Sequence, residues 1–291
     1  MELIDKLIEK YAERNVRLYS VTQIKDNKAD IRYIMPSSAC HNSYSVAKAF
    51  TVTAIGMLVD AGLLSVYDKI YDILGEYFPV TYDKKWEDVT VDNVLLHKMG
   101  IEHGFLDIDT EDITEYGTDD FLNVCFSASL PIPIGEKRVY SDAAYYILSR
   151  VVAKISGENL CDFLRPRLFN PLKFQEVAWS TCPRGYSMGA TGLYIRTCDM
   201  AKLGVVYLND GIYKDARNGD EVRIVSKVWT DFALEHGYEL KLRGIDGNMS
   251  YSKGGMYGQM LYLSKTDNTV LAWHAFDKTG AAKEIMAELG I

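Results

Sequence analysis

The sequence lacks the features that mark metal sites and membrane spans. Its 5 cysteines are scattered, odd in number and without a Cys-x-x-Cys pair, which is typical of free thiols in a reducing compartment. No His-Glu-x-x-His segment occurs, so we expect no metal and no other cofactor. No stretch reaches the ~18 apolar residues of a membrane-spanning helix, and we expect no membrane span.

Basic residues are also too dispersed for a protein that binds polyanions. The chain has 32 basic and 40 acidic residues, a net charge of −8, and Lys and Arg form no dense cluster. This argues against nucleic acid and against an anionic membrane surface as partners. We expect a small-molecule or short-peptide substrate instead, and the sequence leaves the oligomeric state open.

Residues 1–10 do not resemble a signal peptide, because acidic residues interrupt every apolar run. Their pattern predicts an amphipathic helix. Together with the scattered thiols, this favours a cytoplasmic protein, with a secreted mature form as the alternative.

Strand and turn signals concentrate near the two ends of the chain. Val16–Gln23 and Ala29–Ile34 flank Asp26-Asn27, a pair typical of a hairpin turn. In the last third, short alternating or apolar segments are separated by turn residues such as Asp246-Gly247-Asn248. They predict an antiparallel meander over residues 238–243, 249–253, 259–265 and 269–276.

Capping residues indicate helices in the middle of the chain. Thr90 precedes Val91–His97, Ser141 or Asp142 precedes Ala143–Ile155, and Thr197 precedes residues 199–209. Further helices are expected near residues 119–127, 160–169 and 279–289. We therefore predict an α+β fold. One sheet domain is built from residues 1–38 and 190–291, and a mainly helical domain spans residues 39–189.

A Ser-x-x-Lys segment, Ser45 to Lys48, opens an apolar run that predicts a buried helix ending near Gly62. Residues three apart share a helix face, so the Lys48 amine should lie beside the Ser45 hydroxyl. A serine becomes a strong nucleophile when a neighbouring base takes its proton, and burial lowers the pKa of a lysine. The backbone N–H of Ser45, near the helix start, could also stabilise an oxyanion.

Two further segments complete a possible catalytic set. Tyr140-Ser141-Asp142 immediately precedes a helix, where the Tyr140 phenol could face a cleft. Lys253-Gly254-Gly255 lies on a predicted strand, where glycines allow a close approach to the backbone. The N–H of Met256 would then be a second oxyanion donor, and Lys253 would attract a substrate carboxylate.

These segments resemble the serine β-lactamase and penicillin-binding-protein superfamily, in its branch of class C β-lactamases, DD-peptidases and esterase-like proteins. Ser45-x-x-Lys48, Tyr140-Ser141-Asp142 and Lys253-Gly254-Gly255 are similar to the family's Ser-x-x-Lys, Tyr-x-Asn and Lys/His-x-Gly motifs and occur in the same order. Leu95–Gly100 and Gly192–Asp199 are similar to two further landmarks. The resemblance extends from about residue 16 to residue 276.

The resemblance implies a β-lactamase/transpeptidase-like fold, an antiparallel sheet flanked by helices with a helical region and the active site between them. It implies a serine hydrolase in which Ser45 forms an acyl-enzyme while Lys48 and Tyr140 share its proton. The N–H groups of Ser45 and Met256 would hold the oxyanion. Asp142, Lys253 and Gly255 would meet the substrate.

Two residues depart from the family pattern. Asp142 stands where the family usually has Asn, and Gly254 stands where lactamases prefer Thr. An ionised aspartate only accepts hydrogen bonds, so Asp142 should disfavour penicillins and cephalosporins and favour simple esters or substrates with a free amine. The opposing hypothesis is that Asp142 only caps the following helix.

Other functions agree less well with the sequence. The absence of Gly-x-Ser-x-Gly disfavours an α/β-hydrolase. An alternative alignment takes Ser141-Asp142-Ala143 as a class A Ser-Asp-Asn motif, although its final Asn is missing. A penicillin-binding sensor or binding module, which acylates with little turnover, is the alternative to an enzyme.

Overall fold

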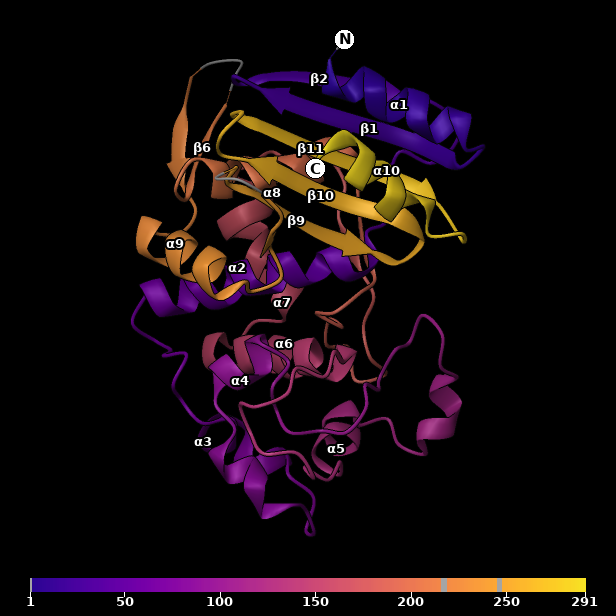
Figure 1. Cartoon of the computed structure of the whole chain (residues 1–291). Coiled ribbons are helices and arrows are strands. Elements are labelled where there is room, and N and C mark those ends of the chain that lie inside the picture. The colour runs from indigo at the N-terminus through magenta and orange to yellow at the C-terminus, as the bar shows by residue number, and fades with distance from the viewer. Residues whose placement is uncertain (1, 216–218, 245–247) are drawn as a thin grey trace. The chain divides into compact units, whose positions relative to one another are not determined.

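The computed structural model describes residues 2–215, 219–244 and 248–291. The chain divides into two compact units (Figure 1). The first comprises Met1–Ala49, Arg167–Ala178 and Leu193–Ile291, and the second comprises Phe50–Pro166 and Trp179–Gly192. The predicted sheet domain (residues 1–38 and 190–291) and helical domain (residues 39–189) stay a prediction. Ser45 and Lys48 belong to the first unit.

The first unit contains an antiparallel sheet of six strands in the order β2-β1-β11-β10-β9-β8. The predicted hairpin and meander are confirmed, with Asp26 and Asn27 both at positive φ in the hairpin turn. Asp246 and Gly247 of one predicted turn lie outside the described residues. The strands are β1 (Arg17–Lys25), β2 (Lys28–Tyr33), β8 (Lys241–Leu242), β9 (Ser250–Gly255), β10 (Gln259–Ser264) and β11 (Thr269–Phe276).

Helices cover both faces of this sheet (Figure 1). Side chains alternate between the two faces along each strand, so each face carries side chains that pack against helices. Leu271 and Trp273 of β11 pack in one core with helices α1 (Leu3–Glu13) and α10 (Ala281–Leu289). Val270 faces the other way, against helix α8 (Thr197–Leu208), where Gly204 allows close packing. The predicted α+β architecture, an antiparallel sheet flanked by helices, is therefore confirmed.

The second unit is mainly helical and is built around α6 (Asp142–Ser156), which is buried without interruption from Asp142 to Val152. Ser141 caps α6 by accepting from the N–H of Ala143, and Gly157 ends it at φ 74°. Thr90 likewise caps its helix, as predicted. This unit also contains α3 (Ile70–Leu74), α4 (Val91–Leu95), α5 (Phe121–Phe126), α7 (Leu160–Leu164) and, from Phe50 on, α2 (Ala47–Asp60).

Some elements differ from the sequence prediction. Thr197 is not a cap: Arg196 precedes α8, and the Thr197 hydroxyl instead bonds the Thr22 hydroxyl at 2.9 Å. Helix α9 (Lys227–His236) and the β6–β7 hairpin (Ile212–Lys214 with Glu221–Arg223) were not predicted. The 5 cysteines are free thiols, as expected. No helix in the described part of the chain combines the length and apolar character that crossing a bilayer requires.

Candidate functional site

Ser45 and Lys48 lie together at the start of a buried helix. Ser45 belongs to a 3-10 turn, η1 (Tyr44–Val46), which leads directly into α2 (Ala47–Asp60). The Lys48 Nζ donates to the Ser45 Oγ at 3.1 Å, and Lys48 has no exposed surface. The geometry expected of a nucleophile and an adjacent base is therefore present in this unit.

Hydrogen bonds within the first unit hold the backbone of the turn that carries Ser45. Just before the turn, β3 (His41–Asn42) pairs with β5 (Leu193–Ile195), and the Ser43 N–H donates to the Leu193 carbonyl oxygen at 2.8 Å. The Asn42 side chain accepts from the Tyr44 N–H at 2.8 Å. These bonds hold the turn that carries Ser45 in place within the first unit.

Gly255, at the end of β9, lies directly against this turn. A Cβ at Gly255 would be 2.5 Å from the Ser43 carbonyl oxygen and 3.2 Å from the Tyr44 Cβ. We expected this glycine to make room for a substrate. In the structure, it also makes room for the chain itself, and so brings the Met256 end of β9 beside Ser45.

Two tyrosines in left-handed backbone conformations lie where Gly255 packs against the turn that carries Ser45. Tyr44, which precedes Ser45, has φ 47°, and Tyr257, which follows Met256, has φ 60°. Their rings contact each other edge to face with centroids 5.4 Å apart. Bulky residues rarely adopt this conformation, and such strain concentrates at functional sites. No pattern in the sequence identified either tyrosine.

A buried hydrogen-bond network supports the loop that carries Met256. The Gln259 Nε2 donates to the carbonyl oxygens of Met256 at 3.2 Å and of Ala275 at 2.7 Å. The Gln259 Oε1 lies 2.9 Å from the His274 Nδ1. Burial, with His41 nearby, lowers the pKa of His274 to about 3, so its ring is neutral at neutral pH. His274 thus supports the loop that carries Met256 through its contact with Gln259.

Lys253 forms an ion pair with the Glu239 carboxylate. Both side chains are almost fully buried, with residue exposures of 8% for Lys253 and 2% for Glu239. The predicted substrate-binding cation therefore already has an anionic neighbour. Glu239 was not identified from the sequence.

The second motif lies in the other unit and is held by His97. The Ser141 N–H donates to the His97 Nδ1 at 3.3 Å, and the Ser141 Oγ donates to the Phe105 carbonyl oxygen at 3.0 Å. The His97 ring also contacts the Tyr140 ring, with centroids 4.6 Å apart. His97 was identified only as part of a family landmark, and the structure assigns it a role in positioning this loop.

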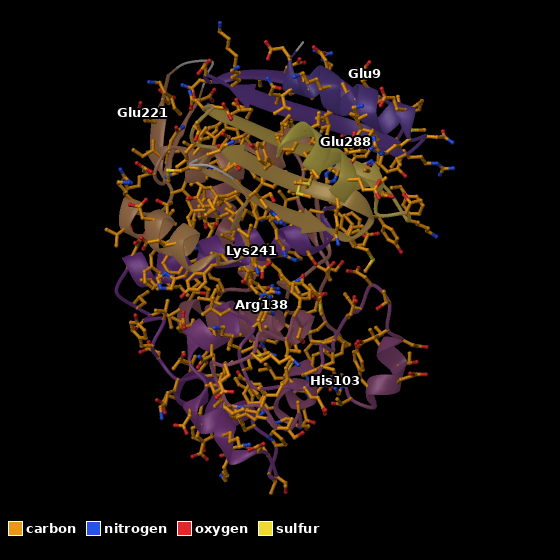
Figure 2. All side chains as sticks on the ribbon, in the orientation of Figure 1. Glu9, His103, Arg138, Glu221, Lys241 and Glu288 are labelled. Carbon is orange, nitrogen blue, oxygen red and sulfur yellow. The ribbon has the colours of Figure 1, made fainter. Side chains whose placement is uncertain are left out.

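Tyr140 and Asp142 have different environments within that loop. Tyr140 is 39% exposed, and the Arg138 guanidinium, labelled in Figure 2, lies 5.3 Å from its ring centroid. Asp142 is 6% exposed and is the first residue of α6, where Ser141 and not Asp142 provides the cap. Its carboxylate lies within 4.8 Å of those of Asp107 and Asp109.

The structure thus divides the predicted site residues between two separately described units. The first unit brings together Ser45, Lys48, Gly255 and Met256, and it also contains Lys253 on β9. Tyr140 and Asp142 belong to the second unit. Their participation with Ser45 in one catalytic site remains a prediction.

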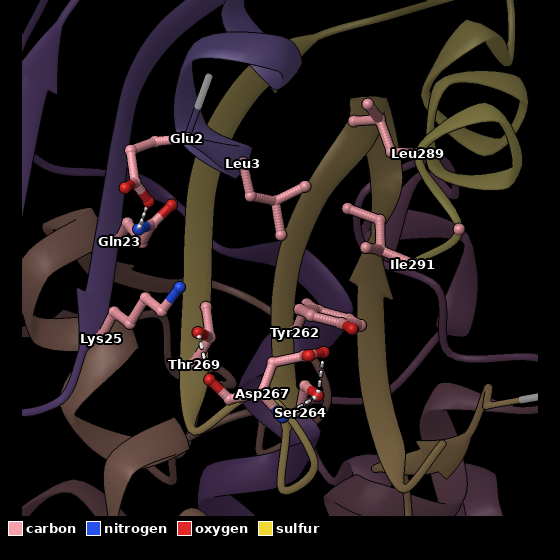
Figure 3. Close-up of a pocket in the computed structure, with 11 residues that line it drawn as sticks. Glu2, Leu3, Gln23, Lys25, Tyr262, Ser264, Asp267, Thr269, Leu289 and Ile291 are labelled. Atoms are coloured by element: carbon pink, nitrogen blue, oxygen red, sulfur yellow. Dashed lines mark hydrogen bonds between the residues drawn. The ribbon is translucent and has the colours of Figure 1, made fainter. Parts of the chain in front are cut away.

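A pocket of about 380 Å³ elsewhere in the first unit has no such constellation (Figure 3). Several of its polar groups hydrogen-bond one another. Ser264 donates to the Asp267 carboxylate at 2.7 Å, and Gln23 donates to the Glu2 carboxylate at 3.4 Å. None of the predicted site residues is among the described residues that line it. We therefore assign no catalytic role to this pocket.

Comparison with known proteins agrees with the geometry. A family model described as Beta-lactamase matches residues 21–288. Penicillin-binding protein 4 of Amycolatopsis lactamdurans is 26% identical over 292 residues, which cover 85% of this chain and 74% of that protein.

Solved structures share the fold at low sequence identity. A protein assigned as a 6-aminohexanoate-dimer hydrolase, from Bacillus anthracis, has a TM-score of 0.79 and 16% identity, covering 96% of this chain and 79% of its own. A class C β-lactamase from Rhodobacter sphaeroides has a TM-score of 0.69 and 13% identity, covering 99% and 97%. The predicted β-lactamase/transpeptidase-like fold is confirmed.

Proposed function

Because this chain belongs to the Beta-lactamase family, we propose that it is a serine hydrolase that acts through an acyl-enzyme at Ser45. The observation that carries the proposal is the 3.1 Å hydrogen bond from Lys48 to Ser45, made by a lysine with no exposed surface. A buried lysine beside a hydroxyl is the arrangement in which lysine acts as a base.

In the proposed reaction, the Ser45 Oγ attacks the substrate carbonyl carbon and gives up its proton to Lys48 and Tyr140. The N–H groups of Ser45 and Met256 hold the oxyanion. The bond to the leaving group then breaks, and the leaving group takes the proton. Water next attacks the acyl carbon and passes a proton back, so that the acid is released and Ser45 is restored.

The assignment of Met256 is supported by the packing of Gly255 against the serine turn and by the Gln259 bond to the Met256 carbonyl oxygen. The assignment of Tyr140 depends on its place in the second motif and on the rigid loop that His97 and Ser141 hold. For the substrate, we propose an ester or amide carbonyl, with penicillins and cephalosporins disfavoured by Asp142.

Labelling with a fluorescent fluorophosphonate tests the nucleophile. Wild type should be labelled, and Ser45→Ala should lose both labelling and turnover of a chromogenic ester. Ser38→Ala, at an exposed serine a few residues earlier, is the matched control and should behave like wild type. Labelling that persists in Ser45→Ala would remove Ser45 from the mechanism.

A time course distinguishes the enzyme from the alternative, a sensor that acylates with little turnover. We expect linear release of p-nitrophenol over many equivalents of protein. A burst of one equivalent followed by no further release would support the sensor. Retention of Ser45, Lys48 and Tyr140 in this chain favours turnover.

A further inference from the structure

Glu239 has two features that cost stability, a buried charge and a left-handed backbone. It carries a carboxylate, it is only 2% exposed, and its backbone has φ 64°, a left-handed conformation that disfavours residues with a Cβ. An isolated buried carboxylate is strongly unfavourable unless a cation pairs with it. Glu239 has such a cation in Lys253, which is 8% exposed.

The backbone around Glu239 explains how the carboxylate reaches Lys253. Glu239 lies just before β8, which pairs with β9 through Lys241 opposite Ser252. The Tyr238 N–H donates to the Ala233 carbonyl oxygen at 2.9 Å, which ties this segment to the end of α9. The conformation at Glu239 is therefore held on both sides, and the ion pair is part of a defined arrangement.

We propose that Glu239 is a specificity-determining residue that cancels the charge of Lys253, so that the enzyme does not select substrates for a carboxylate. This inference rests on the proposed function. A substrate carboxylate that contacts Lys253 would also lie near the Glu239 carboxylate that pairs with it, and the repulsion from Glu239 would offset much of the attraction to Lys253. The preferred acyl groups are accordingly uncharged or end in an ammonium group.

Three p-nitrophenyl esters with six-carbon acyl chains test this on the wild-type protein. They are the hexanoate, the 6-aminohexanoate and the monoester of adipic acid, which end in a methyl, an ammonium and a carboxylate group. We expect kcat/KM for the adipate ester to be no higher than for the hexanoate, at low as well as at high salt. A tenfold or greater preference for the adipate ester that disappears at high salt would overturn the proposal.

Glu239→Gln removes the carboxylate that offsets the charge of Lys253. The variant should raise the adipate-to-hexanoate ratio of kcat/KM by about tenfold, the effect of one partly desolvated charge pair. The double variant Glu239→Gln/Lys253→Met should return the ratio to the wild-type value. Glu235→Gln removes the same charge from an exposed position of α9 and should leave the ratio unchanged.

The outcomes separate this inference from the proposed function. Turnover of the hexanoate that depends on Ser45, with a ratio that Glu239→Gln does not change, contradicts the role of Glu239 alone. A complete lack of Ser45-dependent turnover for all three esters contradicts the proposed function and this inference with it. If Glu239→Gln fails to fold, the wild-type protein still tests the inference, because a salt-dependent preference for the adipate ester would contradict it.

Discussion

The carbonyl oxygen of Tyr140 lies directly against Gly104, so that a Cβ at Gly104 would be only 2.3 Å away from it. This contact is between backbone atoms, which cannot move aside as the end of a flexible side chain can. Gly104 therefore fixes the path of the segment that carries Tyr140 and Ser141.

We predict that Gly104→Ala displaces Tyr140 and lowers kcat for a chromogenic ester by at least about tenfold. Overpacking of this kind also costs roughly 1–3 kcal/mol of unfolding free energy. Gly75→Ala is the matched control in the same unit, because a Cβ there would meet only the Tyr71 ring at 3.8 Å. Unchanged kcat in folded Gly104→Ala would argue against a catalytic role for this loop.

Replacement of Lys48 should separate activity from stability. Lys48→Met removes the proposed base and should lower kcat by about a thousandfold or more with little change in KM. The same change replaces a fully buried amine by an apolar side chain of similar length, so the unfolding free energy should rise or fall by no more than about 1 kcal/mol. Steady-state kinetics and urea denaturation on one preparation measure both. Full activity in the variant would exclude Lys48 as the base.

His274 should make stability depend on pH. Its pKa is about 3 in the folded protein, against about 6.5 when unfolded, so the unfolded state binds more protons between these values. Stability is therefore complete above pH 6.5 and decreases as the pH falls towards 3. At pH 5, this loss amounts to about 2 kcal/mol. Burial also lowers the pKa of His41, which adds to the effect in the same direction.

Urea denaturation from pH 7.5 to 4.5 measures this dependence. His274→Gln should flatten the curve, whereas His103→Gln, at an exposed position, should retain the wild-type slope. A wild-type curve that does not fall below pH 6.5 would mean that His274 takes up its proton as readily in the folded state as in the unfolded state.

Asp142 should set the preference between β-lactams and small esters. Asp142→Asn removes a buried carboxylate that lies within 4.8 Å of two others, and it supplies an N–H₂ donor for a substrate carbonyl. We expect kcat/KM for nitrocefin to rise relative to a p-nitrophenyl acetate reference. Asp162→Asn, exposed in the same unit, is the control. A constant or lower ratio in Asp142→Asn would show that another residue determines the preference.

Local signals in the sequence predicted much of the fold. Asp26-Asn27 predicted the first hairpin because both residues adopt the left-handed conformation that such a turn requires. Helix α9 could have been predicted as well, since Ser226 caps it by accepting from the Trp229 N–H and Gly237 ends it. Thr197 was mistaken for a cap because its hydroxyl bonds to Thr22, a residue 175 positions away in the chain.

The site was predictable only where its residues lie close in the sequence. Ser45 and Lys48 share one helical turn, so their spacing alone predicts their contact. The residues that contact Lys253 and Gly255 could not be predicted from sequence spacing. Glu239 reaches Lys253 through the pairing of two strands, and the strained tyrosines depend on the approach of β9 to the serine turn. Such contacts follow from tertiary packing and leave no local pattern.

The strand order of the sheet determines when the sheet can form during synthesis of the chain. β1 pairs with β11, and Val21 lies opposite Trp273, a strand partner made 252 residues later. At about 5–20 residues per second, β1 waits roughly 12–50 s for that partner, with one backbone edge open to pairing with other chains. Because β9 and Gly255 also come late, Ser45 is translated long before the strand that packs against its turn. A nascent chain therefore bears the nucleophile in an incomplete site until β9 and Gly255 have been synthesised.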